Sequence, residues 1–399
     1  MVDTIEDKVL VREFDDEKDI EMVGKLEKKC EIGSNDKGTC IFTNMMGDPL
    51  CRVRFFPLHL MLVAVLRENE ELVGVIRGCI KHVGTRFGAT YFKLGCILGL
   101  RVSPRHRRMG IGLKLVRAME EWLINNEARY TFLATEKNND ASTNLFTSKC
   151  NYRYLSSLVI FVQPISFAID SHQGGVSPDI IVEKLNTEQA VCFYDNKLKG
   201  KDIYLTDIEA ILKEKLSLGT WVSYFKQDEW IGLHSKEKND IISTSPSSWA
   251  MFSIWNSCEA YKIHLKKSHH PLKFFHETLS QARDKIFPCL KIPICDSLEK
   301  PFGFLFLYGL LGEGERLEEL MKSAWSFASR LAENVKDCKV IITELGVSDP
   351  LMGHVPHQSS MSRIEDVWYL KKVNASINGE DDLGMIGELG NVVVDPRDF

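Results

Sequence analysis

Apolar and polar residues alternate along residues 1–165 with two different periods. A period of two, or a short continuous apolar run, predicts a strand, whereas apolar residues at every third or fourth position predict an amphipathic helix. The predicted strands are 9–14, 59–66, 72–83, 91–102, 130–135 and 158–162, and the predicted helices are 15–30, 110–125 and 140–150. Asp140 is expected to cap the last helix. This order predicts an α+β fold on a mixed sheet.

Residues 181–399 repeat this order of elements. The segment 166–180, rich in Pro, Gly and Ser, predicts a linker between two domains, 1–165 and 181–399. After it, the predicted strands are 181–185, 302–311, 340–343 and 367–373, and the predicted helix is 315–334. The residues at the ends of corresponding strands also match, since Thr135-Glu136 corresponds to Thr343-Glu344. We therefore expect tandem copies of one fold, the second degenerate. A chance likeness of two α/β segments is the alternative.

The composition is that of a soluble globular protein, with 44% hydrophobic and 26% charged residues. A net charge of −5 gives no global attraction to nucleic acid or to an anionic membrane, so neither partner is expected. No apolar run reaches the roughly 18 residues that a membrane-spanning helix needs. The eleven cysteines form no CxxC pair and no zinc-type cluster. This predicts reduced thiols, no metal, and a cytoplasmic or nuclear location. No oligomeric state is predicted.

The segment LGLRVSPRHRRMGIGLKL, residues 98–115, carries the clearest chemical signal. It places Gly110 and Gly112 where a predicted helix begins, and the free N–H groups and dipole of a helix N-terminus attract anions. Residues 101–117 contain six Lys or Arg and no Asp or Glu, which suits phosphate oxygens. The motifs of dinucleotide-binding and Walker loops are missing. A solvated basic helix start, with glycines for the turn alone, is the alternative.

Arg107, Gly110 and Gly112 fit the pattern Arg-x-x-Gly-x-Gly, in which the chain resembles the GNAT superfamily of N-acetyltransferases. A finer resemblance is to plant Hookless-type N-acetyltransferases. It is carried by GDPLCRVR (47–54), LGLRVSPRHRRMGIGLKLV (98–116), ATEKNNDASTNLFTSKCNY (134–152), KLSLGTWV (215–222) and VDPRDF (394–399). The resemblance implies tandem GNAT-like acyl-CoA N-acyltransferase folds, with acetyl-CoA bound by the first of them.

In GNAT proteins the pantetheine arm of the cofactor lies between two strands that splay apart, which here would be 98–102 and 130–135. The resemblance assigns the pantetheine to the backbone of Leu100, Arg101 and Val102, to Asn139, and to the neighbourhood of Ser142, Leu145 and Phe146. It assigns the pyrophosphate to Arg107, Arg108, Met109, Gly110, Ile111, Gly112 and Leu113. For Asn139, a role as a helix cap is the alternative.

Acetyl transfer needs a base, because only a neutral amine is nucleophilic. Glu136 directly follows a predicted strand and can reach the thioester through a water, so it is the first candidate. A surface carboxylate is the alternative. His106 is a second candidate, although it is expected to point toward phosphate. The family often carries a tyrosine that protonates the departing thiolate, and the matching residue here is Phe146. Coenzyme A would then leave as a thiolate aided by water, or another donor would serve.

The corresponding turn of the second half, Gly312-Glu313-Gly314, has the opposite charge. Its acidic residues are Glu313, Glu315, Glu318 and Glu319. Carboxylates there would repel a pyrophosphate, so a single cofactor site is predicted, in the first half. The second half is expected to shape the acceptor cleft or to dock partners. The residues expected in its core include Trp221, Trp249, Trp255 and Trp325.

The leading functional hypothesis is an N-acetyltransferase that modifies a protein amine, a lysine or an N-terminus, by direct attack in a ternary complex. The resemblance suggests a histone or a regulatory protein as acceptor, a nuclear location and a role in plant developmental regulation. A small-molecule acyltransferase is the second hypothesis. The third is a regulatory or interaction protein that binds acetyl-CoA with weak or no catalysis, and Phe146 is the residue that favours it.

Overall fold

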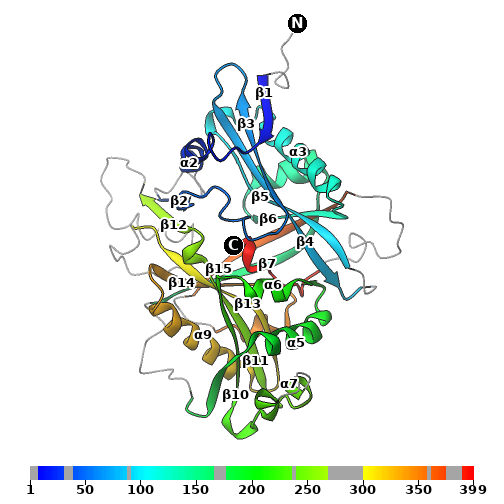
Figure 1. Cartoon of the computed structure of the whole chain (residues 1–399), viewed down its shortest axis with the longest axis vertical. Coiled ribbons are helices and arrows are strands. Elements are labelled where there is room, and N and C mark those ends of the chain that lie inside the picture. The colour runs from blue at the N-terminus through cyan, green and yellow to red at the C-terminus, as the bar shows by residue number, and fades with distance from the viewer. Residues whose placement is uncertain are drawn as a thin grey trace.

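The computed structural model describes residues 8–30, 39–87, 91–165, 177–235, 240–267, 300–356, 361–373 and 389–399. Most of the predicted linker 166–180 lies outside these ranges. Figure 1 shows the two halves of the chain end to end, with the C-terminus at the centre of the molecule. None of the helices in the described ranges is long and apolar enough to cross a membrane.

The predicted elements occur in the predicted order, and the structure adds unpredicted elements at residues 39–44 and between residues 187 and 267. The strands of the first half are β1 (Val9–Glu13), β2 (Thr39–Asn44), β3 (His59–Leu66), β4 (Leu72–Thr85), β5 (Tyr91–Val102), β6 (Tyr130–Glu136) and β7 (Arg153–Pro164). Its helices are α2 (Ile20–Lys29), α3 (Ile111–Asn125) and α4 (Asp140–Asn144). The strands of the second half are β8 (Ile180–Leu185), β9 (Ile203–Leu205), β10 (Ser217–Phe225), β11 (Trp249–Asn256), β12 (Lys262–Lys267), β13 (Gly303–Glu313), β14 (Cys338–Gly346) and β15 (Ser362–Lys372). Its helices are α5 (Thr187–Lys197), α6 (Ile208–Lys213), α7 (Asp240–Ser243) and α9 (Leu317–Glu333).

A single mixed sheet of 13 strands runs through both halves of the described structure. Its order is β1-β3-β4-β5-β6-β15-β7-β14-β13-β11-β10-β8, with β9 added on β4. The pairs β5–β6 and β13–β14 are parallel, and the other pairs are antiparallel. The predicted α+β fold class with a mixed sheet is thus confirmed.

The two halves exchange one strand each at the centre of this sheet. Strand β7 belongs to the first half in sequence, yet it pairs with β14. Strand β15 comes near the end of the chain, yet it pairs with β6. The exchanged strands also pair with each other, from Ser362 opposite Val162 to Leu370 opposite Arg153. The predicted domain boundaries stay a prediction, but the sheet of the first half contains a strand from beyond residue 360.

The repeat extends to a local bulge in corresponding strands. Gly99 in β5 and Gly309 in β13 have φ values of 57° and 60°. At each glycine the antiparallel register shifts by one residue relative to the neighbouring strand. This left-handed backbone suits glycine. A Cβ on Gly99 would lie 2.7 Å from Nη1 of Arg77, so a side chain there would also collide with its neighbour.

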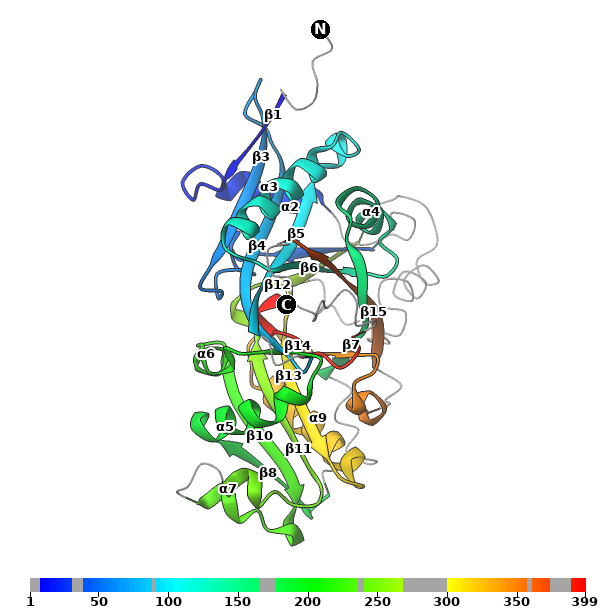
Figure 2. The ribbon, with the colours of Figure 1, turned by 90° about the vertical axis from the view of Figure 1, so that its right-hand side faces the viewer.

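Apolar side chains cover both faces of the sheet. One face carries Phe132, Trp368 and Ile342 in a core that continues through both halves. Helices α2, α5 and α6 and residues 389–399 contribute to this core. The other face packs on α3 in the first half and on α9 in the second. Figure 2 shows α9 and α5 on opposite sides of β10 and β11. The four tryptophans expected in the core are buried, each at most 6% exposed.

Glu27 of α2 pairs with two arginines on the neighbouring strands, of which Arg77 is buried and Arg101 half-buried. Its carboxylate lies 3.0 Å from Nη1 of Arg77 on β4 and 3.4 Å from Nε of Arg101 on β5. Glu27 and Arg77 are both buried. Because buried charges need partners, this triad fixes α2 against the part of β5 that leads to the basic loop.

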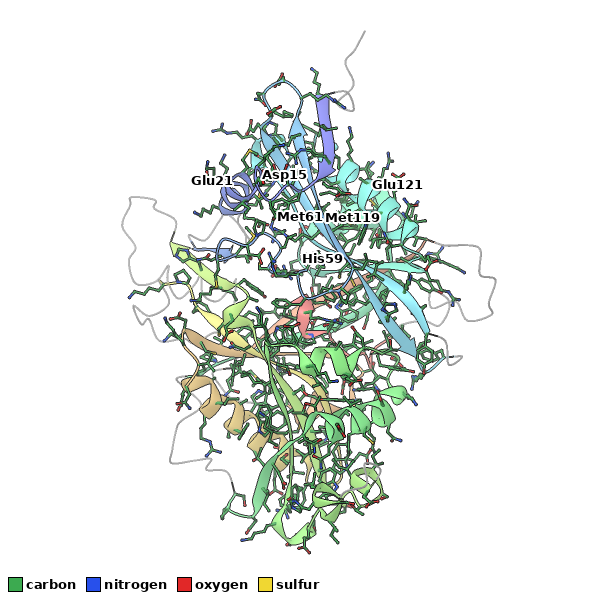
Figure 3. All side chains as sticks on the ribbon, viewed as in Figure 1. Asp15, Glu21, His59, Met61, Met119 and Glu121 are labelled. Carbon is green, nitrogen blue, oxygen red and sulfur yellow. The ribbon has the colours of Figure 1, made fainter. Side chains whose placement is uncertain are left out.

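We expect Glu27→Ala to lower the free energy of unfolding by about 3–5 kcal/mol, because it leaves the buried guanidinium group of Arg77 without its carboxylate. Chemical denaturation followed by tryptophan fluorescence measures this loss. The matched control is Glu21→Ala on the same helix, where the carboxylate forms an exposed pair with Lys25 at 3.4 Å. Figure 3 shows Glu21 on the outer side of α2. Similar losses in the two variants would contradict a structural role for the triad.

Candidate active site

Strands β5 and β6 part after three paired residues. The parallel ladder joins Leu94 to Tyr130, Gly95 to Thr131 and Cys96 to Phe132. Beyond Cys96, β5 continues for six residues and, among the described strands, pairs only with β4, while β6 continues to Glu136 and pairs with β15. The facing edges of these two segments therefore leave their backbone groups available to a ligand. This is the splay that the GNAT resemblance implies, one residue earlier in β5 than expected.

The basic loop leads from β5 into α3. After one turn of 3-10 helix, Pro104–His106, the chain reverses through Arg108 and Gly110, which have φ values of 65° and 78°. Gly110 is the N-cap of α3 and makes no side-chain capping bond. The first N–H groups of α3 therefore have no side-chain acceptor at the N-cap, and they lie beside the exposed loop at the positive end of the helix dipole. The exposed basic side chains of the loop are Arg105, Arg107 and Arg108.

Gly112 lies where the loop, the end of β5 and the segment after α4 come together. A Cβ on this glycine would be 3.5 Å from Leu145, 3.8 Å from Val102 and 3.9 Å from Leu100. A larger side chain would fill the space between the parted strand and α3. The absence of a side chain at Gly112 therefore fits the passage of a slender chain such as pantetheine.

The other predicted loop residues contribute unequally. Met109 is exposed, Leu113 is half-buried, and Ile111 is buried in the core. Ile111 can therefore offer a ligand only its backbone. The side chain of Arg101 is engaged by Glu27, so only its backbone is available as well. The Val102 carbonyl accepts bonds from Nε of Arg107 at 3.4 Å and from Sγ of Cys30 at 3.5 Å.

Asn139 caps α4, and the predicted capping role of Asp140 is wrong. The Asn139 side-chain oxygen accepts a hydrogen bond from the N–H of Ser142 at 3.2 Å, while Asp140 is already the first helical residue. The predicted helix 140–150 is also divided, because Leu145–Lys149 forms a π-helical turn. Phe146 in this turn is buried and packs edge-on against Tyr152, with ring centroids 5.3 Å apart. Its ring is part of the core.

Glu136 is the last residue of β6. Its side chain is exposed and lies on the same face as Phe132, opposite to α3. Partial burial raises the pKa of its carboxyl group. In register with Glu136 on β15 is Asp366, which the sequence did not identify as a site residue. His106 is half-buried, and its Nδ1 has no hydrogen-bond partner among the described residues.

The second pair of parting strands is closed by the chain itself. The parallel ladder of β13 and β14 stops at Leu307 and Thr343. Beyond this point, the residues around a small cavity of about 20 Å³ include Tyr308, Gly309, Leu310, Glu344, Leu345, Val392, Val393 and Val394. The loop that follows β13 is acidic, and Glu313 pairs with Lys197 at 2.7 Å. Both features favour a single cofactor site, as the sequence predicts.

No group of three or more His, Cys, Asp or Glu in the described ranges is arranged to hold a metal ion. The cysteines described are free thiols, and all but Cys192 are buried.

Known proteins share both the sequence and the fold. The sequence model of the Acetyltransferase (GNAT) family matches residues 45–152. The Arabidopsis thaliana proteins probable N-acetyltransferase HLS1-like and probable N-acetyltransferase HLS1 are 37% and 36% identical to this chain. These matches cover 98% of this chain and 99% and 100% of the relatives. The chain belongs to the Hookless-type N-acetyltransferases of the GNAT family. Acetyl transferase GW6a of Oryza sativa subsp. japonica is 31% identical over 98% of this chain and 97% of its own.

The similarity to solved structures concerns the fold. The N-myristoyltransferase of Saccharomyces cerevisiae with bound myristoyl-CoA has a TM-score of 0.53 to this chain at 12% identity. The match covers 98% of this chain and 88% of that enzyme. As a member of its family, the Hookless-type chain is an acyltransferase that uses an acyl-CoA.

We expect Gly110→Asp to weaken coenzyme A binding at least about tenfold more than Gly110→Asn. Both side chains tolerate a left-handed backbone, but only Asp places a negative charge beside a pyrophosphate, where a close charge pair costs more than 1 kcal/mol. Isothermal titration calorimetry with coenzyme A measures the difference, and added salt should reduce it. Equal affinities of the two variants would show that the pyrophosphate binds elsewhere.

Proposed function

We propose that this Hookless-type enzyme transfers the acetyl group of acetyl-CoA to a primary amine of a protein, a lysine side chain or an N-terminus. The observation that carries this proposal is the parting of β5 and β6 beside an uncapped, arginine-rich helix N-terminus. The opening offers free backbone groups to a pantetheine arm, and the loop offers helix N–H groups and arginines to a pyrophosphate.

In the proposed complex the backbone of Leu100–Val102 orients the thioester, and amine attack occurs on the face that carries Glu136. Glu136 accepts one proton from the ammonium through a water, which leaves a neutral amine. The amine nitrogen then forms a bond to the thioester carbon, and the bond from that carbon to sulfur breaks. With a phenylalanine at 146, the thiolate takes its proton from water or from the amine nitrogen.

The acceptor is proposed to be a histone or another regulatory protein, in the nucleus or the cytoplasm, in a pathway of plant development. Two of the relatives are plant proteins named as probable N-acetyltransferases, which supports the reaction type. A chain that binds acetyl-CoA with weak or no catalysis is the second candidate. The buried, hydroxyl-free ring of Phe146 is the observation that favours it.

A screen with labelled acetyl-CoA distinguishes these functions. The acceptors are lysine peptide libraries with blocked N-termini, peptide libraries with free N-termini but no lysine, polyamines, and amino acids. Transfer to one of the peptide libraries supports the proposal. Transfer to polyamines or amino acids alone indicates a small-molecule enzyme, and coenzyme A binding with no product indicates a binding protein.

We expect Glu136→Gln to lower kcat about 100-fold or more on the best acceptor, because a positioned base contributes at least this factor. The control is Glu121→Gln on the exposed side of α3 (Figure 3). If Glu136→Gln retains activity within about threefold of the parent enzyme, Glu136 is not the base.

A further inference from the structure

Three carboxyl groups from three strands lie on one face of the sheet where the exchanged strands meet. Asp366 on β15 lies opposite Glu136 on β6, so the two side chains point to the same face. Glu344 on β14 lies opposite Ile160 on β7, and Ile160 in turn lies opposite Ile364 on β15. Ile364 is two residues before Asp366, so Glu344 and Asp366 point to the same face of the sheet. Glu136 is exposed at the parted strands, whereas Asp366 and Glu344 are 8% and 5% exposed. The three carboxyl groups therefore form a row that runs from the candidate active site into the interior of the protein.

The two inner carboxyl groups are placed to share a proton. Both side chains are buried on the same face of the sheet, and two neighbouring carboxyl groups can hydrogen-bond to each other only if one of them is protonated. Burial, together with the negative charges of Asp366 and Asp398, raises the pKa of Glu344 well above its ordinary value. Burial, and then the charge of Glu136, raises the pKa of Asp366 to about 7. Both shifts favour a protonated carboxyl group in this pair.

The charged groups around this pair are already engaged. Lys81 of β4 faces it, but its ammonium group contacts Asp398 and lies 3.5 Å from Asp395. Arg397, in the same C-terminal segment, bonds to Asp395 and Asp207 at 2.8 Å. Two carboxylates therefore balance Lys81. Lys201, which lines the same cavity as Glu344, pairs with Asp349 at 2.7 Å. Among the described residues, no ion pair joins the Asp366–Glu344 pair to a cation.

A second observation points to proton exchange at this pair. The Oε1 atom of Glu344 is buried and has no hydrogen-bond partner in the described part of the chain. Glu344 also lines the cavity of about 20 Å³ beneath Val392–Val394. A space of this size holds one water molecule. The cavity thus offers the Glu344 carboxyl group a neighbouring site for a water that can take a proton from the pair.

We propose that Glu136, Asp366 and Glu344 form a proton relay that removes the proton of the acceptor ammonium. The proton moves from the ammonium nitrogen to the Glu136 carboxylate and from there to Asp366, where Glu344 stabilises the charged form by donating its hydrogen bond. The neutral amine then attacks the thioester, and the relay returns its proton to solvent before the next turnover. Asp366 and Glu344 are positioning residues in this scheme, because Glu136 alone reaches the substrate. The inference rests on the proposed acetyl transfer and deepens it.

The first test measures kcat/KM against pH with labelled acetyl-CoA and the best acceptor from the screen. An acceptor of protons must begin deprotonated, so the activity of the parent enzyme should rise with pH through about 7. Asp366→Asn should remove this rise and lower the rate about 100-fold. Glu365→Gln is the matched control: it is the next residue on β15, is exposed, and pairs with Lys137. It should change neither the rate nor the profile.

Two substitutions of Glu344 separate the relay from a packing effect. Glu344→Gln keeps a hydrogen-bond donor toward Asp366, so the rise should stay near pH 7. Glu344→Leu removes the donor from the charged form of Asp366, so the rise should move to higher pH. An Asp366→Asn enzyme that keeps the rise and a rate within about threefold of the parent would overturn the relay.

A second measurement does not depend on an acceptor. Carboxyl 13C NMR of the full chain with labelled Asp and Glu should show an Asp signal that titrates near pH 7 and is lost in Asp366→Asn. Absence of that signal overturns the relay, whatever the activity. If the signal is present but the parent chain acetylates no acceptor, the proposed function fails and the catalytic role of the pair fails with it. If the parent enzyme acetylates peptides and Asp366→Asn keeps the same rate and pH profile, the proposed function stands and only the relay is wrong.

Discussion

The pairing of β7 with β15 is the constraint on which the rest of the molecule depends. Each half of the chain supplies a strand to the sheet of the other half, so neither half has a complete sheet by itself. Without β15, the outer edge of β6 would expose unpaired backbone groups. With that edge paired, the inner edge of β6 can stay open beyond Phe132 and still be held in place. The opening beside the basic loop therefore depends on residues near the end of the chain.

The same exchange explains the concentration of charge at the centre. The C-terminal segment lies over the junction of the halves, where Phe399 stacks on Phe306 with ring centroids 4.3 Å apart. It brings Asp395 and Asp398 to the buried Lys81. Buried charges are costly unless they are paired, and such a network is stable only when each charge meets its partner. For the carboxyl groups of Asp366 and Glu344, burial instead raises both pKa values, which favours their neutral forms.

Local patterns in the sequence predicted the elements well, but not their partners. The bounds of β3 and β5 are those predicted, because the apolar spacing of a strand is a property of consecutive residues. The cap of α4 moved by one residue, since Asn and Asp at adjacent positions are both good caps. The VWYLKKV pattern predicts a closing strand but says nothing about which strand it joins. Asp366 was missed for this reason, because its importance comes from β6, about 230 residues earlier in the chain.

The two halves share the backbone pattern of the opening but differ in its charge and in what fills it, and both differences favour the first half as the proposed acyl-CoA site. Both have a parallel strand pair that parts, a glycine bulge with φ near 60°, and a helix that follows. The loop of the first half is rich in arginine, whereas in the second Glu313 and Glu319 are engaged by Lys197 and Arg316. A pyrophosphate gains attraction from the first loop and meets carboxylates at the second. Residues 392–394 line the space between the second pair of strands. The chain itself therefore fills the second opening, and Glu344 lines the small space that remains.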